Sequence, residues 1–321
     1  MKTYIFKRLL HMIPLLLGIT FFSFMIISLA PGDFLTTMSQ NPQITAETIE
    51  AMRARFGLDQ PWYIQYFKWL WNILHLDFGY SFASQVPVFM LISQRMLNTF
   101  TLALSAALFA WLISIPLGII SAVRQNSVVD RTASFVSFIG LSIPEVFFAL
   151  IMVYFAAKTG WFPIGGMKSI DFEYMSMWGQ ILDLIHHLIL PTIVLGSVSM
   201  AGRMRQMRAN LLDTLLQDYV QTARAKGLSE RVVIYKHALR NAINPLITLF
   251  GFTLANLLSG AFLVEVVMSW PGLGRLTLDA LFARDLYLVM GALIMASVML
   301  ILGNLTADIL LAVSDPRIQY E

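Results

Sequence analysis

Long apolar runs separated by shorter polar segments dominate this chain. The first run, Leu9–Ala30, is followed by no small-residue cleavage pattern, so we interpret it as a retained transmembrane helix. Its length suits a helix that crosses a hydrocarbon core of roughly 30 Å. Five further runs predict five more spans: Thr101–Val123, Thr132–Ala157, His187–Gly202, Ala242–Val267 and Leu288–Val313. The pattern predicts an all-α integral membrane protein with six transmembrane helices.

The spans divide the chain into four predicted segments. Residues 1–30 form an N-terminal segment with the first helix, and residues 31–97 form a polar stretch outside the membrane. The transmembrane core covers residues 98–313 and includes a polar loop at 203–241, and residues 314–321 form a tail.

The polar stretch at 31–97 carries helix signals of its own. Thr45 is placed to cap a short helix that Gly57 would end. After Pro61 comes the aromatic-rich sequence PWYIQYFKWLWNIL, which predicts a helix lying at the membrane interface with its rings among the lipid headgroups. This stretch either anchors the domain or shapes a surface for an external partner.

Composition and charge agree with a membrane protein. Hydrophobic residues make up 57% of the chain, charged residues 13%, and there is no cysteine, which excludes disulfides and thiolate metal sites. Six spans would place most Lys and Arg on the side of the N-terminus, which assigns that side to the cytoplasm. The basic character then reflects membrane topology, and nucleic-acid binding is not expected.

The loop 203–241 holds eight Lys and Arg against three acidic residues. Asp218 is followed three positions later by Gln221, a capping-box pattern that predicts a helix over Tyr219–Lys226. Gly227 would end that helix in the left-handed conformation. The predicted loop therefore faces water on the cytoplasmic side.

A second helix is expected over Glu230–Arg240, with Ser229 as its cap. The two helices would present small side chains and cations outward. Such a loop is either a solvated basic surface or a contact surface for another protein.

Sequence motifs extend this interpretation. TARAKG followed by KHALRNAINP resembles the EAA loop of binding-protein-dependent ABC importer permeases, particularly of the peptide and nickel branch. Further similarities, in the family's order, are LAPGD, FGLDQP, LDFGYS, LSIPEVFFAL, HLILPT, WPGLG, RDLYLVMG and SDPRIQY. Together they cover nearly the whole chain.

The resemblance implies a type I ABC importer permease fold in a bacterial or archaeal inner membrane, and uptake of di- or oligopeptides by alternating access. The implied partners are membrane lipid, a paralogous permease, two cytoplasmic ATPases that hold ATP and Mg²⁺, and an extracytoplasmic solute-binding protein. The loop would couple to the ATPases through Asp218, Tyr219, Gln221, Thr222, Ala223, Arg224, Ala225, Lys226, Gly227 and Leu228. The family's Glu-Ala-Ala falls on Gln221–Ala223, so the charge usual at its first position is absent.

Four residues outside the loop are candidates for the translocation path or a gate. Glu145 lies inside a predicted span, where a carboxylate is costly and normally faces a cavity or a partner. It either lines the path and receives a substrate amine, or it is a satisfied acid at a subunit interface. By resemblance, Glu265, Trp270 and Pro271 lie in a gate region beside the binding protein.

The chain lacks the motifs of an enzyme. It has no phosphate loop, no H-E-x-x-H and no G-x-S-x-G, so we expect no catalytic residues, no bound cofactor and no ATP hydrolysis by this chain. His186 and His187 are adjacent and point about 100° apart on a helix, which disfavours a shared metal. Nickel or another small solute remains an alternative substrate, and an ion-coupled secondary transporter an alternative class.

Overall fold

The computed structural model describes the backbone of residues 2–39 and 44–314. It also describes their side chains, except at positions 2–9, 37, 55, 248, 250–256, 259–260 and 307–314. The predicted tail therefore lies outside the described residues from position 315 onward. All regular secondary structure of the described part is helical, as predicted.

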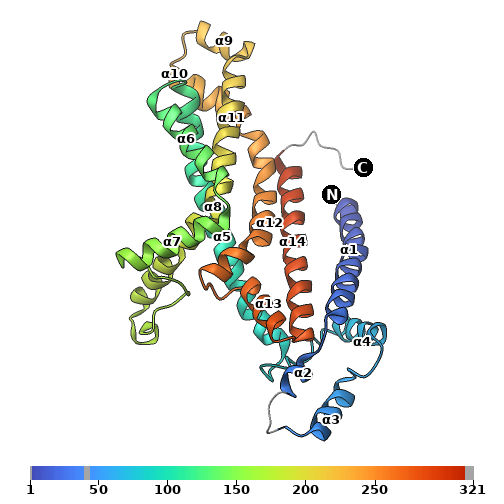
Figure 1. The fold of residues 1–321 in the computed structure, drawn as a ribbon. Coiled ribbons are helices and arrows are strands. Elements are labelled where there is room, and N and C mark those ends of the chain that lie inside the picture. The colour runs from blue at the N-terminus through green and yellow to red at the C-terminus, as the bar shows by residue number, and fades with distance from the viewer. Residues whose placement is uncertain (1, 40–43, 315–321) are drawn as a thin grey trace. The chain divides into compact units, whose positions relative to one another are not determined.

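The chain forms two compact units, each of which is continuous in space but not in sequence. The first unit combines Met1–Thr99 with Pro271–Ile301, and the second combines Phe100–Trp270 with Leu302–Glu321. The long helices α5 (Val88–Val123) and α14 (Leu286–Ser314) each contribute to both units (Figure 1).

The first unit also contains five further helices: α1 (Lys2–Leu29), α2 (Phe34–Met38), α3 (Ala46–Phe56), α4 (Trp62–Leu74) and α13 (Leu273–Phe282). Its core is aromatic, because Phe24 of α1 packs against Tyr66 and Trp69 of α4 and against Met290 of α14. The aromatic stretch therefore forms the predicted helix, but one side of that helix is a packing surface rather than a headgroup contact. Its opposite side exposes Tyr63, Phe67, Trp71 and Leu74.

Local capping signals in this unit behave as predicted. The Thr45 side chain accepts a hydrogen bond from the backbone of Thr48, and α3 ends at Gly57 with φ of 66°. Asp285 caps the start of α14, because its Oδ1 accepts from the Leu288 amide at 3.2 Å. Its Oδ2 accepts from the Ser81 hydroxyl at 2.6 Å and from the Ala83 amide at 3.0 Å. The buried Asp285 thus ties the polar stretch to α14.

The second unit is organised around α8 (Met177–Leu215), against which several other helices pack (Figure 1). These are α6 (Val128–Ser142), α7 (Glu145–Thr159) and α12 (Asn244–Val267), followed by the smaller elements of the polar loop. Its core gathers small side chains of α5 with Val194 and Leu195 of α8. Gly196 allows this approach, since a Cβ there would lie 2.9 Å from the Ala106 carbonyl oxygen.

The predicted span Thr132–Ala157 is wrong as a single helix. The chain breaks at Ile143–Pro144, and α6 and α7 meet at an angle of 104°. Proline disfavours a helical conformation in the residue before it, and Ile143 accordingly has ψ of 120°. Glu145 consequently opens a new helix instead of lying inside a continuous one.

The predicted span His187–Gly202 is too short. Helix α8 begins at Met177, so Pro191 lies well inside it and not in its first turn. At its other end Met204, Met207 and Leu211 are buried at helical spacing. Their packing stabilises the extension of α8 into the predicted cationic loop.

Within the described residues, four helices are long and apolar enough to cross a membrane, or up to five if the bent pair is one span. They are Leu10–Thr36, Val88–Val123, Met177–Leu215 and Leu286–Thr306, with α6 and α7 as the pair. Helix α12 occupies the predicted fifth span over 24 residues, although many of its central side chains lie outside the described set.

Candidate functional site

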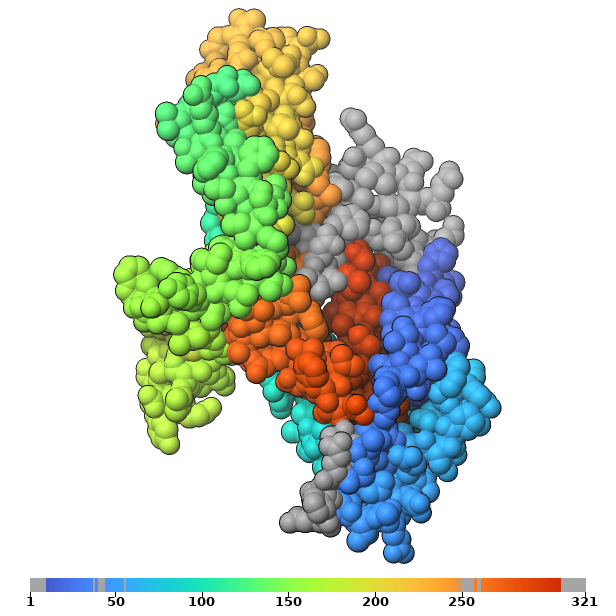
Figure 2. Space-filling model, viewed as in Figure 1, coloured from blue at the N-terminus to red at the C-terminus, as the bar shows by residue number. Residues whose placement is uncertain are grey.

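The first part of the predicted loop 203–241 is helical, because α8 continues to Leu215. The remainder, from Leu216 onward, forms one tip of the second unit and is drawn in yellow and orange in Figures 1 and 2. Helix α9 (Asp218–Ala225) coincides closely with the helix predicted from the capping pattern. Gly227 follows with φ of 75°, in the left-handed conformation expected for a stop. Open space surrounds the position of a Cβ there, so the backbone angle alone demands glycine.

Helix α9 is anchored by one face and exposed on the other. Val220 and Ala223 are buried among apolar side chains of the loop and α8, including Met207 and Leu211. The expectation that Ala223 points outward is therefore wrong, whereas Ala225 is exposed. The exposed set comprises Asp218, Tyr219, Gln221, Thr222, Ala225, Lys226, Gly227 and Leu228, with Arg224 half-buried.

The predicted caps of the two loop helices are not formed. Gln217, not Asp218, precedes the first helical residue of α9, and its side chain makes no capping hydrogen bond. Ser229 occupies the cap position of α10 (Glu230–Val232), also without a side-chain bond. Other contacts hold the turns, among them the hydrogen bond that the side-chain amide of Gln221 donates to the Leu215 carbonyl at 3.1 Å.

An ion pair bridges the two arms of the turn at Gly227. Arg224 Nη2 donates to Glu230 Oε1 at 2.7 Å, and Arg224 Nε donates to Glu230 Oε2 at 3.3 Å. These side-chain hydrogen bonds hold the pKa of the Glu230 carboxyl below its usual value. At neutral pH the pair is charged and restrains the turn.

The predicted second helix, Glu230–Arg240, is interrupted. After α10 the chain forms a π-helical segment, η2 (Val233–Ala238), and then α11 (Leu239–Ala242). The wider turn brings Val233 and Ala238 into one buried cluster. The Asn241 amide then donates to the Tyr219 hydroxyl at 2.8 Å, which ties the end of the loop back to α9.

Two charged residues that were not predicted as site residues join α8 to α6 next to the loop. Arg208 of α8 donates Nε and Nη2 to the buried carboxylate of Asp130 on α6. The only sequence signal for Arg208 was its membership in a cationic segment, and for Asp130 its place after Ser127, whose hydroxyl caps α6.

The candidate path residues lie in different settings. Glu145 stands at the break between α6 and α7, and its Oε1 is buried without a hydrogen-bond partner among the described residues. Glu265 of α12 is fully buried. Trp270 is buried in the apolar core of the second unit.

Pro271 belongs to the first compact unit, whereas the other three belong to the second. Its carbonyl accepts from the Asn98 amide at 2.8 Å, and the neighbouring Leu273 amide donates to the Thr99 hydroxyl at 2.8 Å. Pro271 and Leu273 of the sequence WPGLG are therefore anchored about three turns into α5.

Comparison with known proteins places this architecture in a family. Residues 114–320 match the family model described as binding-protein-dependent transport system inner membrane component. Residues 1–103 match the corresponding N-terminal model of such membrane components.

Curated relatives align over their full length. The chain is 45% identical to the oligopeptide transport system permease protein AppB of Bacillus subtilis, with both chains covered completely. It is 36% identical to the dipeptide transport system permease protein DppB of Escherichia coli K12, again over all of both chains.

Among solved structures, the inward-facing MetNI methionine ABC transporter shares the fold, with a TM-score of 0.56 and 17% identity. The match covers 70% of this chain and 97% of that one. The relatives are permeases, that is, transport components rather than enzymes. The predicted family is confirmed, and the chain belongs to the binding-protein-dependent transport system inner membrane components.

Proposed function

We propose that this chain is a membrane-spanning permease subunit of an ATP-driven importer of di- and oligopeptides. The observation that carries the substrate class is the full-length identity of 45% to an oligopeptide permease, supported by 36% to a dipeptide permease. The observation that supports ATP drive is the shape of the loop. An eight-residue helix is fixed by one buried face and leaves a polar face open to a partner.

The proposed topology has six spans with the N-terminus in the cytoplasm of a bacterial or archaeal cell. Four helices and the bent pair supply five of the spans, and α12 supplies the sixth. The concentration of Lys and Arg in segments on the N-terminal side supports this orientation. The loop then faces the cytoplasm, where an ATPase is available.

The proposed assembly contains a paralogous permease, two cytoplasmic ATPases and an extracytoplasmic solute-binding protein. ATP and Mg²⁺ belong to the ATPases, and this chain binds neither. Residues 218–228 form the docking surface, and closure of the ATPases moves α9 and, through it, α8. Such transmission needs a rigid element, and the Arg224–Glu230 pair together with the buried Val220 supports that rigidity.

Glu145, Glu265, Trp270 and Pro271 are proposed to line the path or its gate. Glu145 is the strongest of the four, since a buried carboxylate oxygen without a hydrogen-bond partner among the described residues is a costly feature in a membrane protein. A substrate amine would give that oxygen a partner during passage.

The test is affinity purification of the C-terminally tagged chain in mild detergent, with every co-purifying protein identified by mass spectrometry. We expect a second permease and two ATPases, and dipeptide uptake in cells that depends on this chain. Nickel uptake without peptide uptake would replace the substrate class. A homo-oligomer without any ATPase, alongside an intact control complex, would overturn ATP drive.

A further inference from the structure

A cavity of about 680 Å³ lies entirely within the first compact unit. Its apolar wall is formed by Ile26 and Ile27 in the last turns of α1, by Trp62 of α4, and by Leu286 and Val289 at the start of α14. Three sequence motifs distant along the chain meet around it, LAPGD, FGLDQP and RDLYLVMG. Its volume is that of a small-molecule site.

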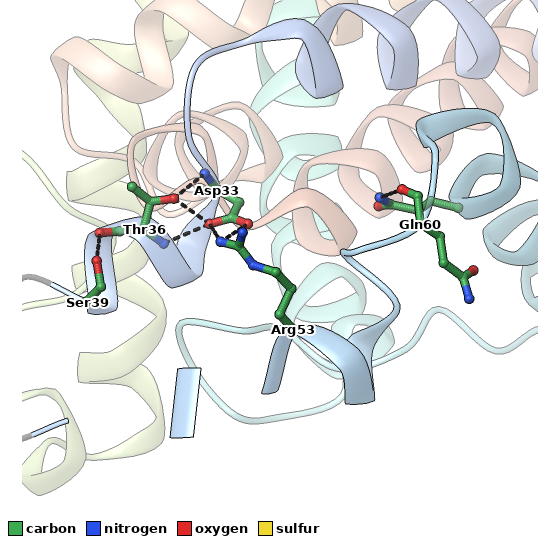
Figure 3. A network of polar contacts seen from close by, with 6 residues as sticks. Asp33, Thr36, Ser39, Arg53 and Gln60 are labelled. Carbon is green, nitrogen blue, oxygen red and sulfur yellow. Dashed lines mark hydrogen bonds and ion pairs between the residues drawn. The ribbon is translucent and has the colours of Figure 1, made fainter. Parts of the chain in front are cut away.

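One side of the cavity is polar and held in place by hydrogen bonds (Figure 3). Asp33 accepts from the Thr36 amide at 2.7 Å and from the Thr36 hydroxyl at 2.6 Å, which fixes its carboxylate. Arg53 reaches from α3 and donates Nη2 to Asp33 Oδ2 at 3.1 Å. Its Nε is buried and has no hydrogen-bond partner among the described residues. Arg53 thus lines the cavity with a guanidinium that Asp33 holds in place.

A second guanidinium lines the same cavity. Arg284 adopts a left-handed backbone with φ of 54°, and its Nη1 lies so close to Gly32 that a Cβ there would collide with it. The Arg284 backbone amide donates to the Leu281 carbonyl at 3.1 Å, but its guanidinium has no hydrogen bond or ion pair in the described part of the chain. Among the described residues that line the cavity, Arg53 and Arg284 are the cations and Asp33 is the only acid.

The place of the cavity indicates its ligand. It lies where the candidate span Leu10–Thr36 ends and where the span Leu286–Thr306 begins, which is the boundary between membrane and water. Ile26 lines the cavity and is also 64% exposed, so the apolar wall continues onto a surface that faces lipid. Cations above an apolar wall at this depth match the headgroup and upper acyl chain of an acidic phospholipid.

We propose that this cavity binds the phosphate group of an acidic phospholipid, contacted by Arg53 and Arg284, with the acyl chains against Ile26, Leu286 and Val289. Guanidinium groups suit phosphate because their donors match its oxygens in pairs. The lipid would link α1, α3 and α14 within the unit. The inference depends on the membrane location of the chain and not on the substrate or the orientation proposed above.

The test uses the intact complex, purified in mild detergent and stripped of lipid. Phosphatidylglycerol or phosphatidylcholine is added back, and bound lipid is counted by native mass spectrometry. We expect the native complex to prefer phosphatidylglycerol, and this preference to fall about fivefold for each guanidinium removed in Arg53→Gln and Arg284→Gln. Arg284→Lys keeps the charge but loses the paired donors, so it should keep only part of the preference.

Arg95→Gln is the matched control, because it removes a cation from the same unit outside the cavity and should leave the preference unchanged.

Each variant must elute as an assembled complex, and Arg284→Lys provides the readout if the glutamine variants do not assemble. Equal binding of the two lipids, or an unchanged preference in the Arg53→Gln/Arg284→Gln double variant, would overturn the proposal. So would displacement of the lipid by inorganic phosphate or by a free dipeptide. A native complex that binds phosphatidylglycerol as expected but takes up no peptide would count against the proposed function only.

Discussion

Arg208 of α8 holds the carboxylate of Asp130 on α6 with two hydrogen bonds, from Nε to Oδ1 at 2.7 Å and from Nη2 to Oδ2 at 2.8 Å. The backbone amide of Asn126 donates a third, at 2.9 Å, to Oδ2. The Asp130 side chain is only 4% exposed, so this is a buried, bidentate pair. It joins α6 to the part of α8 that leads into the cationic loop.

Replacing Asp130 by Asn should therefore destabilise the assembled permease by about 3 kcal/mol, because the half-buried guanidinium of Arg208 loses its counter-charge. Thermal unfolding of the purified complex measures the effect. Asp279→Asn is the control, since Asp279 is 66% exposed and 3.9 Å from Arg275, and such surface pairs contribute about 0–1 kcal/mol. Equal shifts in the two variants would contradict the role of the pair.

Two alanines of α9 provide a matched test of the loop. Ala223 is buried and Ala225 is exposed on the same short helix. Ala223→Glu should prevent the loop from folding, at a cost on the order of 3 kcal/mol for the buried charge, and lower the yield of assembled complex. Ala225→Glu should leave the fold intact and reduce docking of the ATPases.

Yield, ATPase co-purification and peptide uptake separate these outcomes. Ala225→Glu is expected to insert normally and to lose uptake together with bound ATPase. If Ala225→Glu binds ATPase and transports at the normal rate, α9 is not the docking surface.

The parts of the fold that local chemistry controls could be predicted from the sequence. Thr45 and Gly57 delimit α3 as expected, and Gly227 adopts the expected left-handed conformation shortly after α9. These features are local, because a capping side chain or a glycine affects only backbone groups a few residues away. Hydrophobic runs likewise located α1, α5, α12 and α14, although not all of their ends.

Contacts between distant segments could not be predicted in this way. The Asp130–Arg208 pair spans 78 positions, and the extension of α8 to Leu215 depends on packing against α6 and the loop. Pro144 lies inside the predicted span Thr132–Ala157, but membrane helices tolerate proline, so the continuous apolar run favoured a single span. The inward position of Ala223 follows from which face of α9 meets α8, and that is a tertiary choice.

The ion pair between Arg224 and Glu230 predicts a pH dependence of the loop. The pKa of Glu230 is lowered in the folded state, so the pair stabilises the turn fully at pH values above 4.5, the ordinary pKa of the group. This contribution is lost as the pH falls from there through the lowered folded-state value. Hydrogen exchange of residues 218–230, corrected for intrinsic rates, should therefore show less protection at acid pH than at pH near 7.

Glu230→Gln removes the titrating group and serves as the control. It should reduce protection at neutral pH and abolish the extra loss in acid. The same acid-induced loss in Glu230→Gln would assign the effect to another group.

Glu145 provides the sharpest test of the translocation path. Its buried Oε1 has no hydrogen-bond partner in the described part of the chain, so Glu145→Gln should leave assembly unchanged. If the carboxylate receives the amine of a passing peptide, loss of its charge should slow uptake about tenfold, equivalent to one charge-assisted hydrogen bond. Glu173→Gln, an exposed acid in the connection before α8, should transport normally. Uptake by Glu145→Gln at the rate of the Glu173→Gln control would remove Glu145 from the path and make it a buried structural acid at the break between α6 and α7.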